Sequence, residues 1–274
     1  LIMKWGVVCS AHTKRSIALA KDVISFLSEH GTVFAEETIA EKLSIQGFSF
    51  SQINDDCDIV VTIGGDGTII RTLADVDKPL FTINSGGMGF LSEVESKFAL
   101  QGLKKVIEKE YNVEERAKLQ VDVEGIDKKL PDVANEITLQ TARIAEIMYF
   151  HIFVENELLE TMGADGVIVA TPTGSTSYAL SVGGPIMDPT VEAMIIAPLA
   201  PFRLAARPWV VPLKKKVQLQ VLPKSKEAKL VIDGNYAVDV QTDQKITISE
   251  SKRKARFIRF GESFYQMVRL KLVR

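Results

Sequence analysis

Cysteines, long apolar runs and an excess of either charge are all scarce in this 274-residue sequence. Only Cys9 and Cys57 occur, so neither a secreted disulfide scaffold nor a cysteine zinc site is expected, and a reducing, cytoplasmic environment fits best. No segment reaches the roughly 20 apolar residues that a transmembrane helix needs, and the start lacks a signal-peptide core. The 33 basic and 35 acidic residues leave a net charge of −2, which argues against nucleic-acid or membrane-surface partners.

Metal-ligating patterns are also missing. The three histidines, His12, His30 and His151, are scattered, and none has a partner at metal-ligand spacing, so we predict no metal site built from protein side chains. The remaining composition is that of a folded protein, with 46% hydrophobic and 25% charged residues. The length suits two domains or one large one.

The first 115 residues alternate short apolar runs with helical patterns, as parallel strand–helix–strand units do. We expect strands at 5–9, 32–35, 58–63 and 80–83, and helices at 15–30 and 98–111. Gly31 stands where a helix C-cap is wanted. This part is therefore predicted to be an α/β nucleotide-binding domain with a parallel sheet.

From residue 116 to about 250 the pattern changes to strands separated by turns rich in Gly, Pro, Asn and Asp, with few helical stretches. We expect strands at 118–124, 132–139, 144–155, 167–170, 217–221, 228–232 and 245–249. This predicts a mainly β, sandwich-like second domain. Residues 251–274 are expected to add a strand and a helix that pack back on the first domain.

The sharpest local motif is GGDGT at residues 64–68, which links an apolar strand to an amphipathic helix. Glycines let backbone amides approach a ligand, and the unpaired N–H groups at the start of a helix suit phosphate. Neither a Walker loop nor a Rossmann fingerprint is present. The predicted phosphate-binding set is Gly64, Gly65, Gly67, Thr68 and Arg71, although a place on the surface of the helix is favoured for Arg71.

Asp66 is the unusual residue of this loop, because a carboxylate repels phosphate. Its presence beside phosphate-binding amides is therefore expected only if it acts on the ligand. It could accept a proton from an attacking hydroxyl, hold a metal or bond a ribose hydroxyl. The structural alternative is a turn residue or a helix N-cap.

Two further segments carry polar groups between apolar strands. Residues 84–90 (NSGGMGF) follow the next expected strand, and the carboxyl ends of adjacent parallel strands would place them beside the first glycine loop. Residues 171–178 (TPTGSTSY) offer six hydroxyl groups on a constrained backbone, which suits the polar edges of a nucleoside. The pair Asn135–Glu136 could add to them, or could simply mark an edge strand.

Taken together, these motifs resemble those of the NAD kinase family. GGDGT, the N-x-G-x-x-G-F pattern at 84–90, Asn135–Glu136, the D-G-x-x-x-x-T-P-T-G-S-T-x-Y pattern at 165–178 and Asp233–Gly234 occur in the family's order. The resemblance implies an α/β domain joined to a β domain, with the site in the cleft between them. It implies transfer of a phosphoryl group from ATP or polyphosphate to the adenosine-ribose 2′-hydroxyl of NAD, giving NADP.

The resemblance also implies roles for individual residues and partners. Asp66 would engage the ribose hydroxyl as the general base. The NAD-binding positions implied are Asp66, Gly67, Phe90, Asn135, Glu136, Asp165, Thr173, Thr176, Ser177, Tyr178, Ser181 and Ala200. Mg²⁺, held mainly by the nucleotide phosphates, would shield the donor. Self-association to a homodimer or homotetramer is expected as well.

Two other functions remain open at this point. Lipid and sugar kinases also carry a GGD loop, although the TPTGST segment argues against them. A dinucleotide-binding sensor without turnover would keep the pocket, although it would gain little from a carboxylate beside phosphates.

Overall fold

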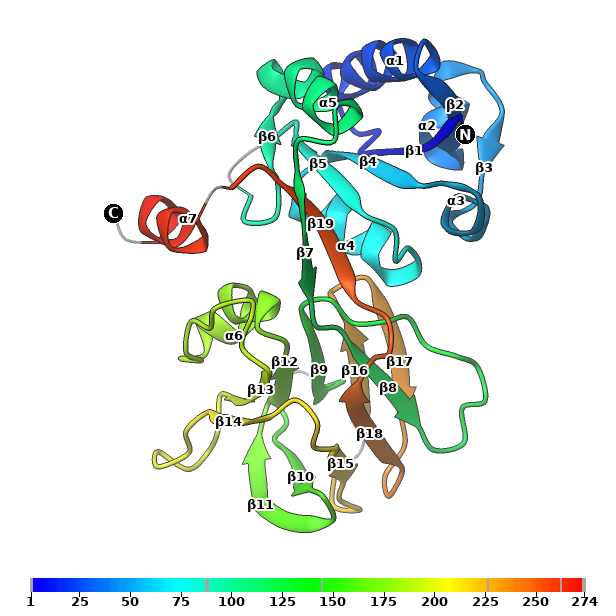
Figure 1. Cartoon of the computed structure of the whole chain (residues 1–274). Coiled ribbons are helices and arrows are strands. Elements are labelled where there is room, and N and C mark those ends of the chain that lie inside the picture. Colours follow the sequence, from blue (N-terminus) through cyan, green and yellow to red (C-terminus); the bar gives the residue numbers. More distant parts are fainter. Residues whose placement is uncertain (1, 87–88, 144, 226, 262, 273–274) are drawn as a thin grey trace. The chain divides into compact units, whose positions relative to one another are not determined.

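The computed structural model describes residues 2–86, 89–143, 145–225, 227–261 and 263–272 (Figure 1). The chain divides into two units, one formed by residues 1–115 and 255–274 and the other by residues 116–254. The chain returns from the second unit to the first after residue 254, whereas the sequence suggested residue 250. Residues 251–254 therefore belong with the second unit.

The first unit is built on one sheet with the strand order β3-β2-β1-β4-β5-β19-β7, to which β6 is added beside β5. Each pair of neighbouring strands from β3 to β5 in this order is parallel, and so is the pair β5 and β19. The carboxyl ends of β1, β4 and β5 therefore meet at one edge, where ligands bind in open α/β sheets. The strands are β1 (Met3–Cys9), β2 (Gly31–Glu36), β3 (Gly47–Phe48), β4 (Ile59–Gly64), β5 (Leu80–Asn84), β6 (Val94–Glu95), β7 (Asn112–Arg116) and β19 (Ala255–Arg259).

Helices cover both faces of this sheet (Figure 1). On one face α1, α2 and α5 bury their apolar sides against β1, β4 and β5, and Leu27 of α1 and Leu103 of α5 are fully buried there. On the other face α3 and α4 pack together, and Ile53 of α3 lies against Gly6 of β1. The helices are α1 (Lys14–Ser28), α2 (Glu37–Leu43), α3 (Phe50–Asp56), α4 (Asp66–Asp75), η1 (Ser96–Phe98), α5 (Ala99–Ile107) and α7 (Phe264–Lys271).

The role expected for Gly31 is wrong. The first helix ends at Ser28 with Glu29 as its C-cap, and Gly31 begins β2 instead. A Cβ on Gly31 would lie 2.1 Å from the carbonyl oxygen of Met3 in β1. Gly31 is therefore required by the close approach of two paired strands and not by the end of a helix.

The second unit consists of two antiparallel sheets, with the orders β11-β10-β15-β18-β8 and β14-β13-β12-β9-β16-β17. The predicted fold class, a parallel α/β domain followed by a mainly β domain, is thus confirmed. Residue 144, the expected start of one strand, lies outside the described residues. The strands are β8 (Leu119–Val123), β9 (Glu136–Thr141), β10 (Met148–Val154), β11 (Glu157–Ala164), β12 (Gly166–Ala170), β13 (Ala193–Leu199), β14 (Trp209–Pro212), β15 (Val217–Val221), β16 (Ala228–Ile232), β17 (Tyr236–Val240) and β18 (Lys245–Glu250).

Both sheets contribute to one hydrophobic core, in which Phe150 and Leu219 of one sheet and Leu139 and Val169 of the other are fully buried. Strand β12 is buried on both faces, because α6 (Tyr178–Ser181) and Met187 cover its outer side. This explains why the segment 166–170 is a continuous apolar run, unlike the alternating strands around it. The polar segment 171–178 starts directly at the end of this buried strand.

Candidate active site

The GGDGT motif forms the junction between β4 and α4, as predicted. Gly65 is the N-cap of α4 and Asp66 is its first residue. A Cβ on Gly64 would lie 2.3 Å from Oγ1 of Thr68, whereas a Cβ on Gly65 or Gly67 would have no atom within 4 Å. The first glycine is thus required by packing, and the other two leave open space in front of the backbone. The N–H groups at this end of α4 can therefore be approached by an anion.

The Asp66 carboxylate connects the two glycine-rich segments. It accepts hydrogen bonds from the backbone N–H of Phe90 (2.7 Å) and of Leu91 (3.1 Å). Gly64 also pairs with Asn84 in the β4–β5 register, so the prediction that the two loops lie side by side is confirmed. Asp66 is not the helix N-cap, since that position belongs to Gly65. Gly87 and Met88 of the second loop lie outside the described residues.

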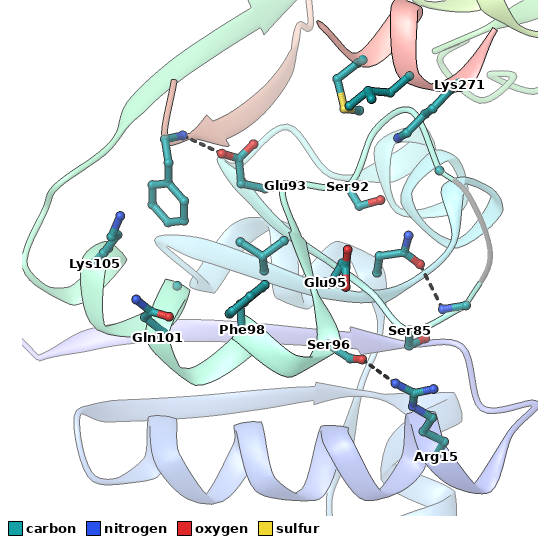
Figure 2. Close-up of a pocket in the computed structure, with 18 residues that line it drawn as sticks. Arg15, Ser85, Ser92, Glu93, Glu95, Ser96, Phe98, Gln101, Lys105 and Lys271 are labelled. Atoms are coloured by element: carbon teal, nitrogen blue, oxygen red, sulfur yellow. Dashed lines mark hydrogen bonds between the residues drawn. The ribbon is translucent and has the colours of Figure 1, made fainter. Parts of the chain in front are cut away.

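A cavity of about 620 Å³ adjoins the second glycine segment within the first unit. Figure 2 shows the side chains of Arg15, from α1, and Lys271, from α7, at opposite sides of it. Ser85 is fixed by a 2.9 Å hydrogen bond to Ser16, and Arg15 donates to Ser96 at 3.0 Å. The volume of the cavity is typical of a small-molecule site. The cavity is lined by Arg15, Asn84, Ser85, Gly86, Gly89, Ser92, Glu93, Val94, Glu95, Ser96, Phe98, Gln101, Gly102, Lys105, Phe260, Met267, Leu270 and Lys271.

Gly89 connects this cavity to Asp66. It lines the cavity, and a Cβ at this position would lie 2.6 Å from Oδ1 of Asp66. Asp66 therefore lies just behind one wall of the cavity. Sequence reasoning did not find the cavity, because its walls come from α1, α5 and α7 as well as from the glycine segment. The polar pair Asn84–Ser85 before the glycines was the one signal that the sequence offered.

In the second unit, the structure brings Asn135 and Glu136 together with the hydroxyl-rich segment. Glu136 begins β9 opposite Ala170 of β12, and the hydroxyl of Ser177 donates to the Glu136 carboxylate at 3.3 Å. A Cβ on Gly174 would lie 2.1 Å from the carbonyl oxygen of Asn135, so the two backbones are in close contact. Residues 173–176 form a 3-10 helix that leads into α6.

The electrostatics of this region are unusual. Burial, together with the negative charge of Asp233, raises the pKa of Glu136 to about 7. Burial also raises the pKa of Asp233 to about 6, although hydrogen bonds from three backbone N–H groups and the charge of Lys118 oppose the shift. Oε2 of Glu136 is buried and has no hydrogen-bond partner among the described residues. Such a group suits a ligand hydroxyl or amide.

Asp165 and Ala200 lie at the opposite end of β12 from Glu136. The Asp165 N–H donates to the carbonyl of Leu199 at 3.0 Å, which places both residues where β12 starts and β13 ends. Thr171 lies six positions after Asp165, which is roughly 20 Å along an extended strand. The side chain of Asp165 and that of Ala200, whose φ is +47°, are exposed.

The side chains of the other predicted positions are placed as follows. Thr173 is buried, whereas Tyr178 and Ser181 are exposed on α6. Thr176 donates through its hydroxyl to the carbonyl of Thr173 at 3.3 Å. Arg71 forms an ion pair with Glu36 (3.8 Å) and lies over the ring of Phe50.

The described residues contain no group of three or more His, Cys, Asp or Glu side chains arranged to hold a metal ion. Within the same residues, no helix is long and apolar enough to cross a membrane.

Comparison with known proteins agrees with these features. The ATP-NAD kinase N-terminal domain family matches residues 6–111, and the ATP-NAD kinase C-terminal domain family matches residues 134–260. The NAD kinase of Methanothermobacter thermautotrophicus is 39% identical over 277 residues, covering 99% of this chain and 97% of that protein. The chain belongs to the NAD kinase family. The reaction of this family is the phosphorylation of NAD to NADP.

The chain is also similar to other proteins over nearly its whole length. The NAD kinase of Thermoplasma acidophilum is 36% identical over 272 residues, covering 99% of this chain and 98% of that protein. Among solved structures, an NAD kinase from Archaeoglobus fulgidus in complex with ATP is 29% identical with a TM-score of 0.75, covering 97% and 99% of the two chains. Yeast NADH kinase, solved with NADH, shares the fold at a TM-score of 0.90 and 23% identity, covering 99% of this chain and 87% of that one.

Proposed function

We propose that the protein transfers the terminal phosphoryl group of ATP, or of polyphosphate, to the adenosine-ribose 2′-hydroxyl of NAD, with Asp66 as the general base. The observation that carries this proposal is the position of the Asp66 carboxylate. It lies at the start of α4 between Gly65 and Gly67, and both glycines leave open space in front of the backbone. It is held from the other side by the N–H groups of Phe90 and Leu91.

In this reaction the ribose oxygen forms a bond to the transferred phosphorus while the bond to the leaving phosphate oxygen breaks. The hydroxyl proton passes to the Asp66 carboxylate. A ribose hydroxyl is a weak nucleophile at neutral pH, so positioning and late acceptance of its proton supply most of the catalysis. Two hydrogen bonds from backbone N–H groups orient the Asp66 carboxylate for this step and leave lone pairs for the proton.

The donor is proposed to bind at the start of α4 and in the adjoining cavity. The open backbone at Gly65 and Gly67 accommodates its phosphates in this proposal, and Arg15 contributes positive charge from the cavity wall. Phosphate roles for Gly64, which packs against Thr68, and for Thr68, whose N–H donates to the Gly65 carbonyl, stay predictions. The ATP complex of the Archaeoglobus fulgidus relative supports ATP as the donor. A phosphate role for Arg71 stays a prediction beside its ion pair with Glu36.

A divalent cation, Mg²⁺, fits this site as an ion held mainly by the donor phosphates, with the Asp66 carboxylate available beside them. When bound, it would neutralise charge on the phosphates during transfer.

The acceptor NAD is proposed to bind to the second unit through Asn135, Glu136 and the segment from Thr173 to Ser181. The buried, unpartnered Oε2 of Glu136 supports this assignment, because a ribose hydroxyl would supply its missing donor. Phe90, Asp165 and Ala200 complete the predicted set. Self-association to a dimer or tetramer also stays a prediction, and light scattering on the purified protein tests it.

The experiment compares Asp66→Asn with the wild type in NADP formation from NAD, ATP and Mg²⁺, read through an NADP-specific dehydrogenase. We expect kcat to fall about a hundredfold or more, the usual range for loss of a general base. The matched control is Asp22→Asn, an exposed carboxylate on α1, which should leave kcat unchanged. Turnover by Asp66→Asn at the wild-type rate would remove Asp66 from its assigned role.

A further inference from the structure

The backbone of residues 134–136, which leads into β9 and includes its first residue, is held by two residues from elsewhere in the second unit. The Asp233 carboxylate accepts hydrogen bonds from the N–H groups of Ala134 (2.7 Å), Asn135 (2.8 Å) and Glu136 (2.9 Å). The Asp233 N–H in turn donates to the carbonyl of Glu136 at 2.9 Å. Charged acceptors form stronger hydrogen bonds to backbone N–H groups than neutral acceptors do, so Asp233 restrains all three residues.

Thr171 holds the same backbone through its remaining carbonyl groups. Its hydroxyl donates to the carbonyl of Ala134 at 2.6 Å, and its N–H donates to the carbonyl of Asn135 at 2.8 Å. All six backbone polar groups of residues 134–136 are therefore bonded by Asp233 and Thr171. With all six groups bonded, the segment has little freedom to move.

The conformation of Asp233 directs its carboxylate toward this segment. Asp233 follows β16 with a φ of +48°, and Gly234 follows with a φ of +68°. These two residues lie in the turn between β16 and β17, and Asp adopts the left-handed region more readily than most non-glycine residues do. In this conformation the Asp233 carboxylate accepts the three hydrogen bonds from Ala134, Asn135 and Glu136.

We infer that Asp233 and Thr171 are positioning residues, which fix the backbone of residues 134–136 so that the side chains of Asn135 and Glu136 are presented to the dinucleotide. The inference rests on the proposed function, which assigns Asn135 and Glu136 to NAD binding. Since the backbone is held entirely from outside, neither side chain is needed to hold its own segment. Glu136 keeps one buried carboxylate oxygen for a ligand.

The first test is Asp233→Asn in the full chain. An Asn side chain keeps one acceptor oxygen but turns an NH₂ group toward backbone N–H donors, so at least one of the three bonds is lost. We expect the Kd for NAD alone, measured by calorimetry, to rise about tenfold or more, because small displacements of binding groups are costly. The Kd for ATP alone should stay within about twofold of wild type, since the donor is assigned to the first unit.

Amide hydrogen exchange supplies a readout that does not depend on ligand affinity. In Asp233→Asn the amides of residues 134–136 should exchange faster, while those of β10 and β15 stay protected. A rise in Kd for NAD without faster exchange would show that Asp233 contacts the ligand directly, and would overturn the inference. Faster exchange with an unchanged Kd for NAD would overturn it as well.

A second pair of variants covers the case in which Asp233→Asn fails to fold. Thr171→Val removes the hydroxyl that donates to the Ala134 carbonyl and accepts from the Gly174 N–H, whereas Thr171→Ser keeps both bonds. We expect a rise of about threefold or more in the Kd for NAD with Val, and recovery to near the wild-type value with Ser. An equal Kd for wild type, Val and Ser would overturn the role of Thr171.

Two controls separate this inference from simpler explanations. Leu219→Ala opens a cavity in the core of the other sheet and should lower the melting temperature without changing the ratio of the two Kd values. If it changes that ratio as Asp233→Asn does, the effect is general instability and the inference is wrong. Glu136→Gln tests the proposed function itself. If this variant binds NAD as the wild type does, the role of Glu136 in NAD binding is refuted. If Glu136→Gln binds NAD more weakly while Asp233→Asn binds it normally, only the positioning role of Asp233 is refuted.

Discussion

At the scale of single residues, Glu136 combines a buried site with an ionisable group. Its ordinary pKa of 4.5 is raised to about 7 by burial and by Asp233. Between these two values the folded protein binds more protons than the unfolded chain does. The contribution of Glu136 to stability is therefore present below pH 4.5 and is lost as the pH rises through 7. A residue kept for structure alone would not be expected to carry this penalty at neutral pH.

We predict that Glu136→Gln becomes more stable relative to the wild type as the pH rises from 5 to 8. The neutral amide does not ionise, so it avoids a loss of up to about 3 kcal/mol in the wild type over this range. Urea denaturation at several pH values measures the difference. Glu157→Gln, at the exposed start of β11, is the matched control and should show a constant difference. A pH-independent difference for Glu136→Gln would contradict the prediction.

At the scale of elements, the β4–α4 junction separates two kinds of glycine. We predict that Gly64→Ala lowers the free energy of unfolding by about 1–3 kcal/mol, because its Cβ would lie 2.3 Å from Oγ1 and 2.6 Å from Cβ of Thr68. Gly65→Ala should change it by less than about 1 kcal/mol, since the space is open and its φ is −93°.

For donor binding we expect Gly65→Ala to have an effect that its small change in stability does not explain. A methyl group at Gly65 occupies the open space assigned to phosphate, so the KM for ATP should rise in a protein that is as stable as the wild type. Chemical denaturation and steady-state kinetics measure the two effects. Equal losses of stability in Gly64→Ala and Gly65→Ala would contradict the distinction drawn between them.

The elements also show how far sequence reasoning reaches. Long amphipathic or β-branched segments, such as α1 and β4, were predicted within a few residues because their periodicity is local information. The seven-residue helices α2 and α3 were not, because so short a segment carries less than two turns of pattern. Gly31 was misassigned because a helix end and a tight strand pair both favour glycine.

The candidate site follows the same division. The glycine loops, Asp66 and the hydroxyl-rich segment are continuous motifs, and their residues were identified from the sequence. The contacts of residues 134–136 with Asp233 and Thr171 depend on the register of β9 against β12 and β16, which pairs residues far apart in the chain. The local sequence of each strand does not show which distant strands it pairs with. The cavity walls from α5 and α7 were missed for the same reason.

At the scale of the whole molecule, the first unit is discontinuous in the chain, because β19 returns to its sheet between β5 and β7. We predict that a chain ending at Lys254 fails to form a stable first unit, since it lacks β19 and its fully buried Phe257 and Ile258. A chain ending at Gly261 keeps β19 and should fold, but it lacks the α7 wall of the cavity and should bind ATP more weakly.

Circular dichroism, thermal denaturation and calorimetric ATP titration distinguish the two truncated chains. A cooperative, wild-type-like transition of the first unit in the chain ending at Lys254 would contradict the structural role of β19. Wild-type ATP affinity in the chain ending at Gly261 would show that α7 takes no part in donor binding.

The place of β19 has a consequence for how the protein is made. During translation, β7 leaves the ribosome without its neighbour in the sheet, and about 140 residues must be synthesised before that neighbour arrives. The β unit, whose chain is continuous, can complete itself while the earlier portion still waits with an open sheet edge. The sheet of the first unit is therefore complete only after β19, near the end of the chain, has been synthesised.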